Sequence, residues 1–131
     1  MKVGLKVVRD DFGSLTDGHG RVLYPLNEWV DVPGNGAYVA MTGGLFAAGD
    51  GPKLIYLECK GKELVSSIDG VVCFSLVRRI PACPDRLHPD LRRFTSFWDD
   101  HPDQALLSKI AETDSDSDVR EAAVNRIEVL K

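Results

Sequence analysis

The sequence lacks several features that would assign a function directly. It has only three cysteines in 131 residues. None stands at C-x-x-C spacing, so neither a disulfide framework nor a zinc knuckle is indicated. No apolar run approaches the roughly 20 residues of a membrane helix, and the first residues, MKVGLKVVRD, do not form a signal peptide. We therefore expect a cytoplasmic protein that does not contact a membrane.

The motifs of common catalytic and nucleotide-binding sites are also missing. Glycine is plentiful, with 12 residues, but neither G-x-G-x-x-G nor G-x-x-x-x-G-K-[ST] occurs. The three histidines are spread along the chain and cannot be placed beside a cysteine, and His19 lies in a glycine-flanked loop without an assigned role. Alternation with apolar residues predicts that Cys59 and Cys73 are buried inside a sheet. Cys83 lies between Pro81 and Pro84 and is expected to be exposed to solvent. We predict no catalytic residue, no cofactor and no metal, and we leave enzymatic activity open.

Acidic residues are concentrated in the second part of the chain. Residues 1–80 carry nine basic and nine acidic side chains, whereas residues 81–131 carry seven and eleven, which accounts for the whole net charge of −4. Such a surface repels nucleic acid and suits a basic protein partner. The alternative is that these carboxylates are solvated turn residues that favour a helix N-terminus. The predicted partner-binding residues are Asp99, Asp100, Asp103, Asp114, Asp116 and Asp118.

The hydrophobic pattern predicts an α+β fold. Short alternating segments separated by glycine and proline indicate a mainly antiparallel β unit over residues 1–80. Residues 81–87 read as a proline-rich linker, and residues 88–131 as three helices packed against the β unit. We expect one cooperative unit, because so short a helical segment hides too little apolar surface by itself.

Several strands can be placed more closely. The most convincing are 53–60 and 71–79, which are rich in β-branched and aromatic residues. Residues 3–8 alternate so that Val3, Leu5 and Val7 form one apolar face. The extended segment 21–32 is interrupted at Pro25, KELVSSI is expected to add a short strand, and residues 43–50 form either one helical turn or a tight loop.

The helical segment has a clear periodicity. An apolar stripe contains Leu91, Phe94, Phe97 and Trp98, and Trp98 is predicted to be a core anchor. A second helix runs through DQALLSKIAE, with Leu106, Leu107, Ile110 and Ala111 inward. The third, DVREAAVNRIEVL, is expected to be capped by Ser117 or Asp118, with Glu121 completing a capping box. Its inward positions are Val119, Ala122, Ala123, Ile127 and Leu130.

Two short motifs suggest specific functions but have simpler explanations. His88-Pro89-Asp90 and His101-Pro102-Asp103 match the tripeptide of J-domain co-chaperones, yet proline and aspartate are also usual helix-start residues. The run DSDSDV resembles the opening of a calcium loop. Position six is Val119 and position twelve is Asn125, where such a loop needs glycine and glutamate, so we predict no calcium site.

Residues 106–127 resemble a HEAT-type helical pair. An apolar helix ends in Ile110-Ala111, an aspartate-rich turn follows, and Asp118-Val119-Arg120 opens the second helix. The likeness covers about one repeat, and it implies a helical hairpin used for packing or binding.

The β part is similar in its order of features to small domains found in phages and prophages, some of them ADP-ribosyltransferase-like. The resemblance rests on the first strand with Lys6, the YPLNEW segment, the turn after Gly36 and the strand LIYLECKG. It implies host cytoplasm as the location. Such transferases carry Arg or His on the first strand and a late catalytic Glu; Lys6 or Arg9 and Glu58 or Glu63 are poor substitutes.

Three hypotheses of function follow. The first is a non-enzymatic protein-binding module that uses the acidic surface, as a phage-type inhibitor of a host defence complex (an anti-CRISPR protein, for example) would. Its partner would be a basic protein surface, with no direct binding of nucleic acid. The second is a divergent ADP-ribosyltransferase-like or NAD-binding domain. The third is a self-associating phage accessory protein.

Overall fold

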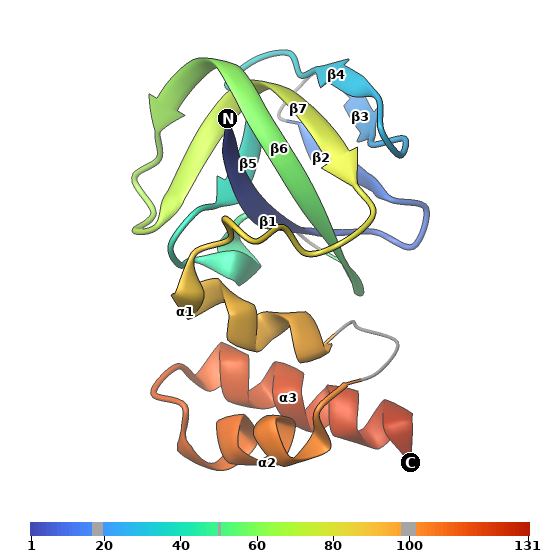
Figure 1. Cartoon of the computed structure of the whole chain (residues 1–131), viewed down its shortest axis with the longest axis vertical. Helices are drawn as coiled ribbons and strands as arrows, with labels where there is room; N and C mark the ends of the chain where they lie inside the picture. The colour runs from blue at the N-terminus through green and yellow to red at the C-terminus, as the bar shows by residue number, and fades with distance from the viewer. Residues whose placement is uncertain (17–19, 50, 98–101) are drawn as a thin grey trace. The chain divides into compact units, whose positions relative to one another are not determined.

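The computed structural model describes residues 1–16, 20–49, 51–97 and 102–131. The chain divides into two compact units, Met1–Leu91 and Arg92–Lys131, called here the barrel unit and the helical unit. The first consists mainly of strands and the second of helices, so the predicted α+β class is confirmed (Figure 1). The predictions for His19, Trp98, Asp99, Asp100 and His101 lie outside the described residues.

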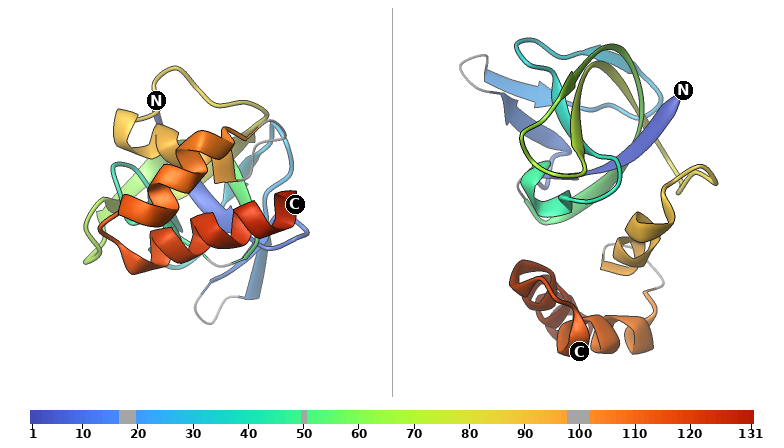
Figure 2. Two further views of the ribbon diagram at one scale, coloured as in Figure 1. Left: turned by 90° about the horizontal axis from the view of Figure 1, so that it is seen from below. Right: turned by 90° about the vertical axis from the view of Figure 1, so that its left-hand side faces the viewer.

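Four antiparallel strands of the barrel unit close on themselves. β1 pairs with both β5 and β6, β5 pairs with β7, and β7 pairs with β6. Figure 2 shows these strands curling round one another. β4 extends the sheet along β7, and β2 with β3 forms a separate two-stranded hairpin. The strands are β1 (Lys2–Val8), β2 (Gly13–Thr16), β3 (Gly20–Leu23), β4 (Trp29–Asp31), β5 (Ala37–Ala40), β6 (Lys53–Val65) and β7 (Val71–Ile80).

The long strand β6 replaces two predicted strands. Residues 53–60 and the following KELV segment form one strand of 13 residues, with a register shift between Lys60 and Glu63. Gly61 lies in this irregularity with φ 83°. A Cβ at Gly61 would stand 2.3 Å from Ser75 Oγ, so only glycine fits there without movement. The expected break between two strands is thus a β-bulge that lets one strand bend.

The first strand is buried on both faces, which corrects the prediction of a single apolar face. Residues 3–8 of β1 are all buried, including Lys6 at 3% exposure. The second face is covered closely, since a Cβ on Gly4 would lie 2.5 Å from Val39 Cγ1. Barrel closure therefore buries both faces of this strand.

Two loop predictions are confirmed. β3 ends at Leu23 and β4 begins at Trp29, so the extended segment breaks around Pro25 as expected. Within residues 43–50, one short 3₁₀ turn, η1, covers Leu45–Ala47, which selects the helical turn over the tight loop.

The apolar stripe predicted for the first helix is present, but most of it lies in a 3₁₀ helix, which is wound more tightly than an α-helix. α1 (Pro89–Arg92) is followed directly by the 3₁₀ helix η2 (Arg93–Phe97). Leu91, Phe94 and Phe97 are buried, and the two phenylalanine rings meet edge to face with centroids 5.6 Å apart. Spacing of three residues suits a 3₁₀ helix, which has three residues per turn. The first HPD triplet begins α1 at Pro89, as its helix-start interpretation predicts.

The two longer helices, α2 (Gln104–Thr113) and α3 (Ser117–Leu130), form the predicted hairpin. Leu107 and Ile110 of α2 and Val119 and Ala123 of α3 are its buried residues. The other predicted inward positions are half-buried: Leu106, Ala111, Ala122, Ile127 and Leu130. Among the described residues no helix is both long and apolar enough to cross a membrane.

Candidate functional site

Four of the six predicted partner-binding aspartates belong to the described part of the helical unit. Asp103 precedes α2, Asp114 and Asp116 lie in the turn between α2 and α3, and Asp118 is in the first turn of α3. Asp99 and Asp100 lie outside the described residues. The candidate site is therefore the turn between α2 and α3, together with the exposed carboxylates around it.

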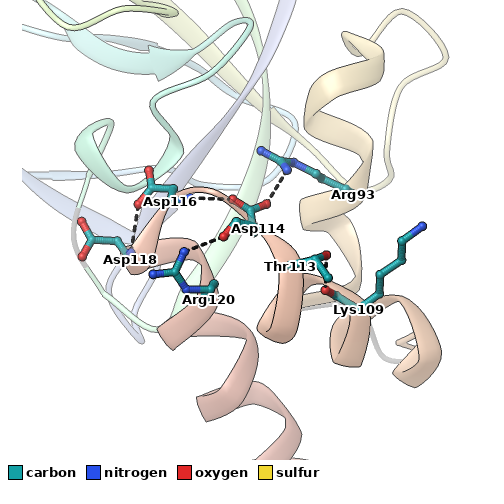
Figure 3. A network of polar contacts seen from close by, with 7 residues as sticks. All are labelled: Arg93, Lys109, Thr113, Asp114, Asp116, Asp118 and Arg120. Carbon is teal, nitrogen blue, oxygen red and sulfur yellow. Dashed lines mark hydrogen bonds and ion pairs between the residues drawn. The ribbon is translucent and has the colours of Figure 1, made fainter.

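Asp114 lies at the centre of the polar contacts that form this turn (Figure 3). Its side chain is only 4% exposed, and Oδ2 accepts a hydrogen bond from Arg93 Nη1 at 2.5 Å. Oδ1 accepts from the backbone N–H of Asp116 at 3.0 Å. The carbonyl oxygen accepts from Arg120 Nη1 at 2.6 Å. Two arginines thus converge on one residue, and the Asp114 carboxylate is not presented to solvent.

Asp116 and Asp103 are helix caps. Asp116 is the N-cap of α3, and its Oδ1 accepts from the N–H of Asp118 at 2.9 Å. This corrects the prediction that Ser117 or Asp118 caps the helix. The reason is backbone geometry: Asp116 has φ −92° and ψ 123°, the extended conformation of a capping residue, whereas Ser117 is already helical. Asp103 caps α2 in the same way, accepting from Leu106 N–H at 3.1 Å.

Exposed carboxylates surround the turn. Glu112 lies close to the turn at the end of α2, and Asp118 and Glu121 lie near the start of α3. All three residues are exposed, as is Asp116. None of the four forms an ion pair within the described part of the chain. Neither of the two arginines forms an ion pair with these carboxylates within the described residues, since Arg93 pairs with the Asp114 side chain and Arg120 donates to the Asp114 carbonyl oxygen. We call Glu112, Asp116, Asp118 and Glu121 the acidic turn surface.

The partner-binding residues predicted from sequence and the acidic turn surface overlap only in part. Asp114 is among the predicted residues, but its side chain is buried. Glu112 and Glu121 are exposed and are not among the predicted residues. Helical spacing could have indicated both glutamates, since each lies within one helical turn of the inter-helix loop. Burial of Asp114 could not be foreseen, because it depends on Arg93, 21 residues earlier.

No metal site is formed by the described residues. Among them, no three His, Cys, Asp or Glu side chains lie in an arrangement able to hold an ion. In the DSDSDV run, Asp114 binds Arg93, and Asp114 and Asp116 each accept a backbone N–H. Two of the three carboxylates at the ligand positions of a calcium loop, those of Asp114 and Asp116, are thus occupied in building the turn.

Three of the four residues considered for transferase chemistry, Lys6, Glu58 and Glu63, have structural roles in the barrel unit. Lys6 is buried, and its ammonium donates to the carbonyl oxygens of Tyr38, at 2.9 Å, and of Ala48. Glu58 forms an ion pair with Arg78 at 3.0 Å. Glu63 forms one with Lys2 at 2.9 Å. These contacts give no observation in favour of the transferase hypothesis.

The cysteines lie as the sequence predicts, with Cys59 and Cys73 buried and Cys83 half-buried. Burial raises the pKa of Cys59 to about 12, and the nearby Glu58 and Glu63 act in the same direction. Burial also raises the pKa of Cys73, against opposing effects of Lys6 and a hydrogen bond from Tyr38. Both buried thiols therefore stay protonated at neutral pH, and a protonated thiol is a poor nucleophile.

Comparison with protein-family models, with curated protein sequences and with solved structures finds no match to this chain.

Proposed function

We propose that the chain is a non-enzymatic binding module that engages a basic protein surface through its acidic turn surface. The observation that carries this proposal is a set of exposed carboxylates that form no ion pair with any described residue, above a backbone that is fixed by hydrogen bonds. Asp114 ties the turn to Arg93 and to the N–H of Asp116, while Glu112, Asp118 and Glu121 stay exposed. A preorganised charged surface loses little conformational entropy on binding.

The partner is defined by charge. A basic groove attracts this surface at long range and pairs with its carboxylates on contact. Complexes that bind nucleic acid, such as the host defence complexes that phage inhibitors block, offer grooves of this kind. Exposed charge pairs are screened over about 10 Å at 0.1 M salt, so binding should weaken as salt rises.

The test uses a variant that removes charge and leaves the turn intact. Glu112→Gln, Asp118→Asn and Glu121→Gln neutralise three carboxylates but keep the Asp114 ion pair and the Asp116 cap. The matched control removes the same charge from exposed carboxylates of the barrel unit that have no ion pair in the described part of the chain. Its substitutions are Glu28→Gln, Asp31→Asn and Asp69→Asn.

Affinity capture from bacterial lysate compares wild type, the neutralised variant and the control. We expect a captured protein that wild type and control retain at low salt and that the neutralised variant loses. A capture pattern that is identical for the three proteins refutes the proposal. Circular dichroism melting of each variant shows that lost capture does not come from unfolding.

A further inference from the structure

The β6–β7 hairpin of the barrel unit carries an excess of positive charge in an acidic chain. Its two strands carry five basic and two acidic residues, and Asp69 in the turn between them is a third acidic residue, whereas the chain as a whole has a net charge of −4. Both carboxylates of the strands are engaged, Glu58 by Arg78 and Glu63 by Lys2. Within the described residues, the remaining four cations of the hairpin form no ion pair: Lys53, Lys60, Lys62 and Arg79.

An aromatic ring lies against this charge. Trp29 on β4 is the direct cross-strand neighbour of Arg78 on β7, and Arg78 is opposite Glu58 on β6. Directly opposed residues share one face of a sheet, so these three side chains form a row across three strands. Lys60 Nζ stands 4.0 Å from the centroid of the Trp29 ring, and Arg78 Cζ stands 4.8 Å from it. Trp29 itself is half-buried.

Such contacts are unusually dense here. A cation over an aromatic ring occurs about once per 70–80 residues. In the barrel unit, four such contacts come from cations of this one hairpin, two on Trp29 and two on Phe12. Two cations on one ring repel each other, and within the described residues only Arg78 of the two forms an ion pair. Asp31 lies across Leu76 from Lys60 on the same face without pairing with it. An anion bound beside Lys60 would relieve that repulsion.

The ligand that fits has both negative charge and flat rings. An acidic peptide would use the cations but not the indole, and a neutral sugar would use the indole but not the cations. Single-stranded nucleic acid uses both, because phosphates pair with Lys and Arg while bases stack on aromatic rings. Lys60 stands over the indole, so its ammonium has to turn from the ring to a phosphate as a base stacks there. We propose that the face formed by Trp29, Lys60 and Arg78 binds single-stranded nucleic acid.

This proposal concerns a different surface from the acidic turn. The expectation that nucleic acid is repelled rests on the charge of residues 81–131, whereas Trp29, Lys60 and Arg78 belong to the barrel unit. The Glu58–Arg78 pair positions the guanidinium beside the ring, and Lys60 supplies the uncompensated charge. Either surface can therefore be removed without altering the other.

The stacking role is tested with a labelled thymidine oligonucleotide of about 12 residues, a length within the range of small single-strand-binding sites. Fluorescence anisotropy at low salt measures its affinity for the full chain. Stacking of a base on an aromatic side chain contributes about 1–3 kcal/mol, so Trp29→Leu should weaken binding about 5- to 150-fold. Trp29→Phe keeps a ring and should retain most of the affinity. In a Trp98→Phe background, the fluorescence of Trp29 should be quenched on binding.

The phosphate contact is tested by salt dependence. For single strands, each phosphate contact contributes about 0.7 to the slope of log affinity against log salt concentration. Lys60→Ala should lower this slope by about 0.7. Lys109→Ala on α2 removes the same charge from an exposed position without a ring contact and should leave the slope unchanged.

Three results would overturn the proposal. They are no binding of the oligonucleotide at low salt, equal affinities of wild type and Trp29→Leu, and equally tight binding of polyglutamate, which would assign the face to an acidic protein. Melting curves show whether Trp29→Leu is folded. If it is not, the exposed Lys60→Ala and its Lys109→Ala control decide the question.

Discussion

Asp114 is the residue whose removal should most disturb the helical unit through polar contacts alone. Asp114→Ala deletes the acceptor of the Arg93 guanidinium and of the Asp116 N–H. The loss of one such hydrogen bond typically lowers the free energy of unfolding by about 1 kcal/mol. We assign the ion pair a similar contribution to the free energy of unfolding, not a larger one, because the Arg93 side chain is 45% exposed and solvent screens its charge. The expected loss is therefore roughly 2 kcal/mol in the free energy of unfolding.

Two further variants separate these contributions. Asp114→Asn keeps an oxygen that can accept from the Asp116 N–H but loses the charge, so about half of the loss, roughly 1 kcal/mol, should remain. A double-mutant cycle of Asp114→Ala with Arg93→Ala should show a coupling energy of about 1 kcal/mol. Glu112→Ala is the control, since this exposed carboxylate has no ion pair among the described residues and its loss should stay within about 0.5 kcal/mol.

Urea denaturation of the full chain, followed by far-ultraviolet circular dichroism, measures these values. The reasoning fails if Asp114→Ala costs no more than Glu112→Ala, or if the Asp114 and Arg93 substitutions are additive. The same result bears on binding: weakened partner binding in Asp114→Ala would reflect a reshaped turn, not a lost contact.

Three other changes test the structure at separate points. Asp116→Ala should cost about 1 kcal/mol by removing the cap of α3, whereas Asp116→Asn should be close to neutral; urea denaturation distinguishes them, and equal losses would exclude the cap. Gly49→Ala should destabilise by about 1–3 kcal/mol, because its Cβ would stand 2.0 Å from Val7 O, and a neutral effect in thermal melting would contradict that contact. The unfolded thiol of Cys59 ionises near pH 9 and the folded one near pH 12, so stability should be complete below pH 9 and fall by up to about 4 kcal/mol towards pH 12. Cys59→Val should flatten this alkaline decline, and an unchanged pH profile would show that the thiol is not buried.

Predictability from sequence depended on how local each feature is. The strand over 71–79 was found from β-branched and aromatic residues, and it is β7 with only one residue added. The break around Pro25 followed from the missing N–H of proline. The stripe of Leu91, Phe94 and Phe97 followed from spacing alone, and all three residues are buried.

Features that need two distant segments were missed or misplaced. Only Val3, Leu5 and Val7 were predicted as the apolar face of the first strand, but the Lys6 ammonium is also buried, against carbonyl oxygens that lie 32 and 42 residues further along the chain. The bulge in β6 looked like a gap between strands, because its strand pairing to β7 is not visible in a local pattern. The cap of α3 was placed one or two residues late, because several residue types in a row could cap and only the backbone conformation selects one.

The candidate site shows the same division. The amino-acid sequence by itself determined that negative charge gathers in the helical part, that a turn joins two helices there, and that its aspartates favour a helix N-terminus; all of these are local properties of composition and spacing. Only the tertiary structure decided which carboxylates remain available. It buries Asp114 against Arg93, turns Asp116 into a cap, and leaves Glu112, Asp118 and Glu121 exposed and unpaired within the described residues. It also sets Trp29 beside Lys60 and Arg78, which lie 31 and 49 positions later. The physical reason is that the burial of a side chain and its ion pairs depend on which distant segments come into contact on folding. The spacing of residues along the sequence does not show those contacts.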